Sequence, residues 1–302
     1  MNQRAEFTWK DTDGGLLVSV RGEIDHHTAA AIRTGMDALL FARRPARLVL
    51  DLSAVTFMDS SGLGLIMGRY GILRELGGSM CVRDPSPEIR GILTLAGMER
   101  RVRIEYTKRT PPAAPDRQSP RSGRAGSGRT AAPGRTGQNK EESHMKRTNT
   151  DSAPRKAQVI NRIQIKFPSL SVNEGLARSA AAVFLAQLDP SVTELADIKC
   201  AVSEAVTNCI VHGYRDAPGI ITMTVSLLEG RTVKIEIRDK GCGIADVRQA
   251  RQPLFTTDAA GERSGMGFTV MESFTDSLRV SSKVGKGTTV TMLRRLSERG
   301  RI

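Results

Sequence analysis

The sequence has few of the residues from which metal centres, disulfide frameworks and membrane spans are built. Its 302 residues include four cysteines and four histidines, and these form neither a C-x-x-C pair nor a complete zinc pattern. No apolar run approaches the ~20 residues that a membrane span needs, and the first residues lack a signal-peptide pattern. We therefore expect a cytoplasmic, reduced protein whose cysteines are small core residues.

Acidic residues are also scarce relative to basic ones, because 32 Asp and Glu stand against 45 Lys and Arg, a net charge of +13. Such an excess suggests nucleic-acid binding. However, residues 107–157 alone hold twelve basic and four acidic residues, which leaves +5 for the rest of the chain. We therefore expect neither direct nucleic-acid binding by the folded parts nor a membrane partner.

The basic segment 107–157 is rich in Pro, Gly, Ser, Thr and Arg and has almost no large apolar side chains. Such a segment cannot bury enough surface to offset its ordering entropy, which predicts a disordered linker. Within it, Lys140-Glu141-Glu142 precedes Met145. Codons for these residues can spell a ribosome-binding sequence before a start codon. We hypothesise that the segment is a translated intergenic region, which the nucleotide sequence would test.

The region 5–106 has strand and helix patterns in alternation, which predicts an α/β sheet. The expected elements are strands at 16–20, 46–52 and 79–83 and helices at 28–41, 61–76 and 87–95.

The region 158–298 has a different order, with two helices before most of its strands. This grouping predicts a two-layer α+β sandwich. The expected elements are helices at 172–188 and 192–212, strands at 220–228 and 233–239, a helix at 266–274 and strands at 277–282 and 288–293.

Polar residues at helix and strand ends of the second region indicate a nucleotide site. Glu204 and Asn208 are four residues apart, so they share one helix face, and a carboxylate beside an amide suits hydrated Mg²⁺. Asp239 ends a predicted strand, and Gly241 and Gly243 allow the backbone to approach a flat base. The combination predicts an ATP site.

The second region resembles the anti-sigma-factor serine kinases of sporulating bacilli, which belong to the ATPase family of gyrase, heat-shock chaperones and histidine kinases. Two stretches carry most of the resemblance: Val202-Ser203-Glu204-Ala205-Val206-Thr207-Asn208 and Arg251-Gln252-Pro253-Leu254-Phe255-Thr256-Thr257. It implies a two-layer, histidine-kinase-like ATPase domain over 158–298 that is a homodimer and uses ATP and Mg²⁺.

The resemblance also implies roles for single residues. Asn208 would hold Mg²⁺, and Glu204 would act as general base. Asp239 would accept from the adenine amino group. The backbone would contact the ligand at Gly241, Gly243, Gly265 and Gly267, Thr288 would close the pocket, and residues 245–263 would form a lid with Arg251 and Arg263.

The first region resembles the anti-sigma-factor antagonists of the STAS fold, through Gly22-Glu23-Ile24-Asp25-His26-His27-Thr28 and Phe57-Met58-Asp59-Ser60-Ser61-Gly62-Leu63-Gly64. Asp59-Ser60-Ser61-Gly62 follows a strand and opens a helix, where we expect a serine as N-cap and where added phosphate is favoured. The resemblance makes Ser60 the phosphoacceptor.

Together the two resemblances imply a fused regulator of a sigma-F-like factor. The C-terminal domain would bind ATP and the sigma factor and phosphorylate Ser60, in its own chain or in a neighbouring one. The alternative is an anti-sigma module that senses nucleotide without phosphoryl transfer. A histidine-kinase-like protein would need a phosphoacceptor histidine on a dimerising helix, whereas His144 lies in the linker.

Three other features have simpler interpretations. For Arg178 two interpretations are open, pairing with another charge on a solvated helix face and contact with a partner, and we expect the former. His26 and His27 are expected at a helix start, since further metal ligands are missing, and His212 at a helix end.

Overall fold

The computed structural model describes residues 6–107, 157–215, 217–253 and 265–298. Residues 108–156 lie outside these ranges, and with them nearly all of the predicted linker and the hypothesis about Met145. The described residues of both regions belong to one compact unit, and contacts within that unit build the site described below.

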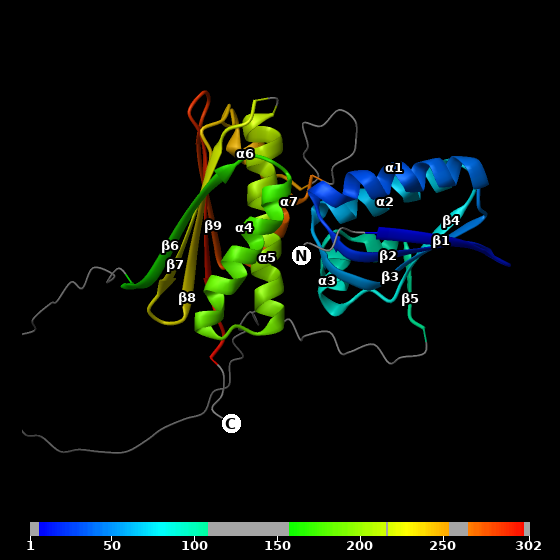
Figure 1. The fold of residues 1–302 in the computed structure, drawn as a ribbon, viewed down its shortest axis with the longest axis horizontal. Helices are drawn as coiled ribbons and strands as arrows, with labels where there is room; N and C mark the ends of the chain where they lie inside the picture. The colour runs from blue at the N-terminus through cyan, green and yellow to red at the C-terminus, as the bar shows by residue number, and fades with distance from the viewer. Residues whose placement is uncertain (1–5, 108–156, 216, 254–264, 299–302) are drawn as a thin grey trace, which may run out of the picture. The chain divides into compact units, whose positions relative to one another are not determined.

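The N-terminal region holds a five-stranded sheet of order β1-β2-β3-β4-β5, with α1 and α2 packed beside each other on it (Figure 1). β1 pairs antiparallel with β2, and the other neighbours are parallel. This confirms the predicted α/β class, although β1 and β5 were not predicted. The elements are β1 (Glu6–Thr12), β2 (Gly15–Ile24), α1 (His26–Arg43), β3 (Arg47–Met58), α2 (Ser60–Glu75), β4 (Ser79–Arg83), α3 (Pro87–Leu95), η1 (Met98–Arg100) and β5 (Arg103–Glu105).

Helix α1 begins at His26 because a capping box fixes its start. Asp25 accepts from the Thr28 N–H at 2.9 Å, and the Asp25 N–H donates to Thr28 Oγ1 at 2.9 Å. His26 and His27 are therefore helix-start residues, as predicted, and the described residues contain no cluster of three metal-ligating side chains. The helix buries Ala29, Ile32, Met36 and Leu40 along one face, and its other side chains are not fully buried.

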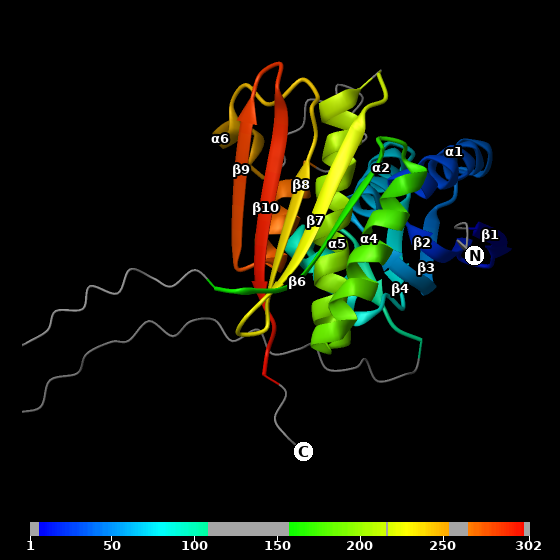
Figure 2. The same cartoon turned by 60° about the vertical axis from the view of Figure 1, so that its left-hand side comes forward.

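The C-terminal region is a two-layer sandwich. An antiparallel sheet of order β6-β7-β8-β10-β9 forms one layer, and α4, α5 and α7 pack on one face of it (Figure 2). This confirms the predicted architecture, with β6 as an additional strand. The elements are β6 (Val159–Pro168), α4 (Val172–Leu185), η2 (Ala186–Leu188), α5 (Val192–Asn208), η3 (Cys209–Tyr214), β7 (Ile220–Leu228), β8 (Thr232–Arg238), α6 (Val247–Ala250), α7 (Gly267–Phe274), β9 (Ser277–Lys283) and β10 (Gly287–Arg295).

Helix α5 is buried along more than one face. Apolar residues such as Val202 and Val206 are fully buried, yet Ser203 and Glu204 are buried as well. The α-helix ends at Asn208 and continues as the π-helical turn η3, which contains His212 near its end. Such turns accompany functional sites, and this one follows the predicted magnesium ligand directly.

None of the helices in the described ranges has both the length and the apolar character required to cross a membrane. Cys81, Cys200 and Cys209 are buried, as predicted. The prediction was wrong for Cys242, which is exposed because it lies in the turn after β8 rather than inside an element.

Candidate functional site

A cavity of about 600 Å³ lies where the end of α5 meets the start of α7 and the ends of β8 and β10. This volume is in the range of small-molecule pockets. Its wall includes every predicted site residue except Gly241, namely Ser60, Glu204, Asn208, Asp239, Gly243, Gly265, Gly267 and Thr288.

Glu204 and Asn208 face the N-terminus of α7 across a space that glycine keeps open. A Cβ at Gly267 would lie 2.9 Å from Glu204 Oε2 and 3.6 Å from the Asn208 amide. The buried Asn208 Nδ2 has no hydrogen-bond partner within the described structure. Because buried polar groups are normally paired, this N–H donor fits an acceptor on a bound ligand, such as a phosphate oxygen, while the amide oxygen beside a carboxylate suits hydrated Mg²⁺.

Asp239 is fixed at the opposite part of the wall by backbone donors. It is 3% exposed, and its Oδ1 accepts from the N–H groups of Gly241 at 2.8 Å and Thr288 at 3.2 Å. A carboxylate held in this way is a rigid acceptor for an amino group of a base.

Gly241 has a packing role beside this carboxylate. A Cβ there would lie 2.1 Å from the Gly213 carbonyl oxygen in η3, so only glycine allows the two segments to approach.

The predicted lid is described as far as residue 253, and Arg263 lies outside the described ranges. Arg251 does not line the cavity, because its guanidinium pairs with Glu272 of α7 at 2.6 Å between Nη2 and Oε1.

The Ser60 hydroxyl donates to Glu204. The distance is 2.7 Å from Oγ to Oε2, and the Ser60 N–H donates to Oε1, also at 2.7 Å. The predicted serine N-cap was wrong, because the N-cap of α2 is Asp59, whose side chain accepts from the Ser61 N–H at 2.8 Å. Ser60 is thus the first helical residue, and its N–H and O–H are both available to Glu204.

Both regions match family models. Residues 167–294 match the histidine kinase-like ATPase domain, and residues 7–110 match the STAS domain. The anti-sigma F factor of Anoxybacillus flavithermus is 51% identical to this chain over 138 residues, which are 46% of this chain and 94% of that protein. The chain belongs to the anti-sigma F factor family.

A second anti-sigma F factor, from Caldanaerobacter subterraneus, is 55% identical over 132 residues, which are 44% of this chain and 92% of that protein. The crystal structure of an anti-sigma factor antagonist from Mycobacterium paratuberculosis is 35% identical and covers 34% of this chain and 87% of that one, with a TM-score of 0.32. The ATPase domain of this anti-sigma F factor family member implies ATP binding.

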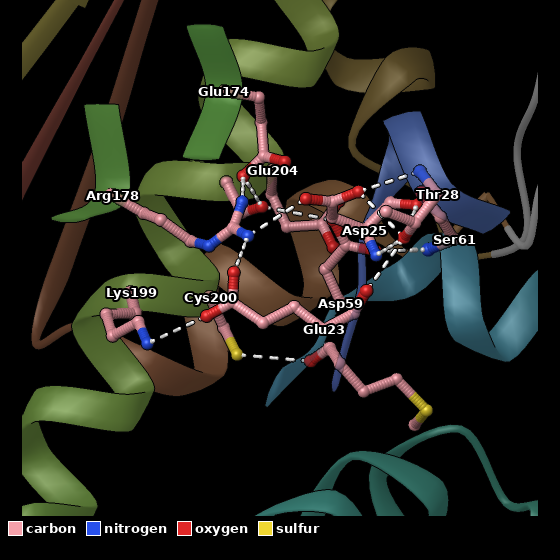
Figure 3. A network of polar contacts seen from close by, with 12 residues as sticks. Glu23, Asp25, Thr28, Asp59, Ser61, Glu174, Arg178, Lys199, Cys200 and Glu204 are labelled. Carbon is pink, nitrogen blue, oxygen red and sulfur yellow. Dashed lines mark hydrogen bonds and ion pairs between the residues drawn. The ribbon is translucent and has the colours of Figure 1, made fainter. Parts of the chain in front are cut away.

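Arg178 of the ATPase domain binds acidic residues of the STAS domain, so the predicted solvated position was wrong (Figure 3). Its side chain is 1% exposed, and Nη2 donates to Glu23 at 2.5 Å and to Asp25 at 2.9 Å. It also pairs with Glu174 one turn earlier on α4 and stacks on the Phe57 ring at 4.4 Å from the centroid. Helical periodicity could not indicate these partners, because three of them, Glu23, Asp25 and Phe57, lie in the other domain.

Lys199 and Cys200 of α5 extend this contact. Lys199 Nζ lies 3.7 Å from Glu23, and Cys200 Sγ donates to the Met58 carbonyl at 3.5 Å (Figure 3). We call this contact between α4 and α5 of the ATPase domain and the STAS domain the docking interface.

A group of buried carboxyls lies within the docking interface. Ser203 Oγ is within hydrogen-bond distance of both Asp59 Oδ2, at 3.0 Å, and Glu174 Oε1. A hydroxyl has one proton, so it can donate to only one of these groups, and a protonated carboxyl donates the other bond.

The pKa values agree with a shared proton. Burial, followed by the charge of Glu204, raises the pKa of Asp59 to about 7. Burial raises the pKa of Glu174 to about 8, although Arg178 acts in the opposite direction. The carboxyl groups named in the docking interface outnumber its named cations, Arg178 and Lys199, which favours a protonated carboxyl there.

Proposed function

We propose that this chain is an ATP-dependent protein serine kinase whose substrate is Ser60. The observation that carries the proposal is the 2.7 Å contact between Ser60 Oγ and Glu204 Oε2 at the wall of the cavity. A hydroxyl becomes a nucleophile when a base within hydrogen-bond distance takes its proton. Glu204 meets this requirement in the docked arrangement.

MgATP, when bound, supplies the phosphoryl group. The Ser60 oxygen forms a bond to the γ-phosphorus while its proton passes to Glu204, and the bond from that phosphorus to the β-phosphate bridging oxygen breaks, which leaves ADP. Asn208 would hold Mg²⁺, and Asp239 would accept from the adenine amino group. The backbone N–H groups of Gly265 and Gly267 would donate hydrogen bonds to the phosphates, and Thr288 would close the pocket.

The anti-sigma role follows from the relatives, which are named anti-sigma F factors. We propose that a sigma-F-like factor binds the same face of α4 and α5 that the STAS domain covers. The STAS domain would then compete with the sigma factor while Ser60 is unmodified.

Phosphorylation would end this competition through charge. A phosphoserine carries about −1.5 to −2 charges at pH 7. At Ser60 it would face Glu204, with Asp59 and Glu174 close by, and these carboxyls outnumber Arg178 and Lys199, the two cations that the described contacts place in the docking interface. Repulsion would release the modified domain and expose the ATPase domain to the sigma factor.

Homodimerisation is the remaining part of the proposal. Exposed apolar side chains on neighbouring elements support it, namely Leu176 and Val183 of α4 and Ile160 of the edge strand β6. A dimer would allow transfer between chains as well as within one. Light scattering of Leu176→Ser against the unmodified protein would test this surface, and an unchanged dimer mass would reject it.

Intact-mass measurement tests the kinase proposal. The purified chain should gain one phosphate with MgATP, and Ser60→Ala should abolish the gain. Ser61→Ala is the matched control and should keep the gain, because Ser61 is the neighbouring serine and its N–H donates to Asp59 instead of Glu204. Undiminished labelling of Ser60→Ala would reject the acceptor, and ATP binding without any labelling would favour the nucleotide-sensing alternative.

A further inference from the structure

The STAS domain contributes more to the cavity wall than its acceptor serine. His26, Ala30 and Arg33 of α1 also line the cavity. Their spacing of four and three residues places them on one helix face, which lies beside the face that α1 buries in its own domain. The contacts of Ser60 with Glu204 are made by the first residue of α2, so the contribution of α1 to the wall calls for a separate explanation.

The charges of the wall indicate what α1 supplies. In the described part of the wall, the ATPase domain contributes the carboxylates Glu204, Asp239 and Asp246 and one arginine, Arg215. Binding of a polyphosphate would place further negative charge beside these carboxylates. Arginine is well suited to meet it, because its guanidinium binds phosphate oxygens with two parallel hydrogen bonds. Arg33 is the arginine that the STAS domain adds to the described wall.

The position of Ser60 locates the end of the ligand. If Ser60 accepts the phosphoryl group, the terminal phosphate lies beside Ser60 Oγ, which belongs to the same domain and the same cavity as Arg33. Resting on the proposed function for the identity of the ligand, we propose that Arg33 binds the β,γ-phosphate end of ATP, so that the acceptor domain completes the nucleotide site. Docking of the STAS domain and binding of ATP then strengthen each other by the same factor.

The test is nucleotide binding by the full chain, with a non-transferable ATP analogue (the β,γ-imido form) and with AMP as probes. Arg33→Gln should weaken binding of the analogue about tenfold or more, as expected for loss of a charge-assisted hydrogen bond. It should leave AMP binding unchanged, because AMP lacks both outer phosphates. Arg33→Lys should restore part of the affinity. Arg43→Gln is the matched control on the same helix, since Arg43 pairs with Asp11 at 2.8 Å and does not line the cavity.

Alkylation of Cys200 separates phosphate binding from docking. The Cys200 thiol is buried against the Met58 carbonyl, so it should resist alkylation in the docked chain. Exposed Cys242 is the internal reference, and because it lines the cavity, alkylation is measured without nucleotide. Selective loss of analogue binding with Cys200 still protected would support the proposal. Equal loss for both nucleotides, unchanged affinity for the analogue, or loss accompanied by exposure of Cys200 would overturn it. None of these readouts needs phosphoryl transfer, so a failure of the kinase proposal would be seen separately in the intact-mass experiment.

Discussion

The two ends of the cavity are built in different ways. At the Asp239 end, one domain provides everything, and backbone groups do most of the positioning. Two N–H groups hold the Asp239 carboxylate, and Gly243 adopts φ +73°, where a Cβ would lie 2.3 Å from the Lys283 carbonyl oxygen. Such a site is fixed once the domain has folded.

At the Ser60 end, side chains from two domains meet, and most of them are charged. Ser60 contacts Glu204, Asp59 contacts Ser203, and Glu23 with Asp25 contacts Arg178. Side-chain charge can be changed by a proton or a phosphate, whereas backbone geometry cannot. Under the proposed function, binding of the base and switching therefore belong to separate ends of the cavity, and substitutions should be able to separate them.

The largest effect is expected for Glu204→Gln, which should affect only the Ser60 end. Glutamine keeps the shape and can accept from the Ser60 N–H, but it is not a base. Transfer should fall about 10²–10⁴-fold, the contribution of general-base catalysis, while AMP affinity stays within about twofold. Quench-flow labelling and AMP titration measure the two quantities. Glu272→Gln, at the exposed partner of Arg251, is the control, and a parallel loss of AMP binding in Glu204→Gln would contradict the separation of the ends.

Arg178→Ala should break the docking interface. The substitution leaves Glu23, Asp25 and Glu174 without their main cation in a buried setting, which costs about 3–5 kcal/mol, or roughly a hundredfold to several thousandfold in the docking equilibrium. Cys200 should then become open to alkylation, with unchanged AMP affinity. Arg251→Ala removes an exposed ion pair instead and should leave Cys200 protected. Persistent protection in Arg178→Ala would mean that the ion pairs do not hold the interface.

Asp239→Asn should affect only the other end. An amide can present its nitrogen where the carboxylate accepted, so AMP affinity should fall roughly tenfold or more, while Cys200 remains protected. Asp246→Asn is a matched control, because Asp246 also lines the cavity but its carboxylate caps α6 by accepting from the Gln249 N–H at 3.0 Å. Equal losses in the two variants would indicate general damage to the cavity rather than loss of a specific acceptor.

The Asp239 end could be predicted from the sequence because its signals are local. Asp239, Gly241 and Gly243 lie within five residues, and the pair Glu204 and Asn208, elsewhere in the cavity wall, is just as local because it spans one helical turn. Such patterns depend on backbone geometry that a short segment largely determines by itself. The same reasoning gave both fold classes, since each follows from the order of helical and strand patterns.

The docking interface could not be predicted in this way. Glu23 is 155 residues from Arg178 in the sequence, and no periodicity indicates which surface of one domain meets the other. Arg178 was therefore placed on a solvated face, and the contact of Arg33 with the cavity was missed. Strand β6 was not predicted either, although its signal is local. Ile163, Ile165 and Phe167 alternate with polar residues along this strand.

The smallest effect expected is a dependence of docking on pH that the Asp239 end does not share. The docked state raises the pKa of Asp59 from its ordinary value near 3.8 to about 7, first through burial and then through Glu204. A raised carboxyl pKa means that docking takes up a proton. The contribution of the Asp59 proton to docking is complete below the ordinary pKa of the carboxyl and is lost as the pH rises through about 7.

Docking should therefore weaken about tenfold between pH 6 and pH 8 from this group alone, since each pH unit between the ordinary and the docked pKa costs up to a factor of ten and the loss levels off above the docked pKa. The groups that face Asp59 include Glu204, Glu174 across Ser203, and Asp25. Alkylation of Cys200, corrected for thiol ionisation with Cys242, measures the change in nucleotide-free protein. Asp59→Asn removes the titrating group and should flatten the profile while keeping Cys200 protected at pH 8. A profile that stays equally steep in Asp59→Asn would assign the proton to Glu174 instead, and a flat profile in the unmodified chain would show that docking takes up no proton.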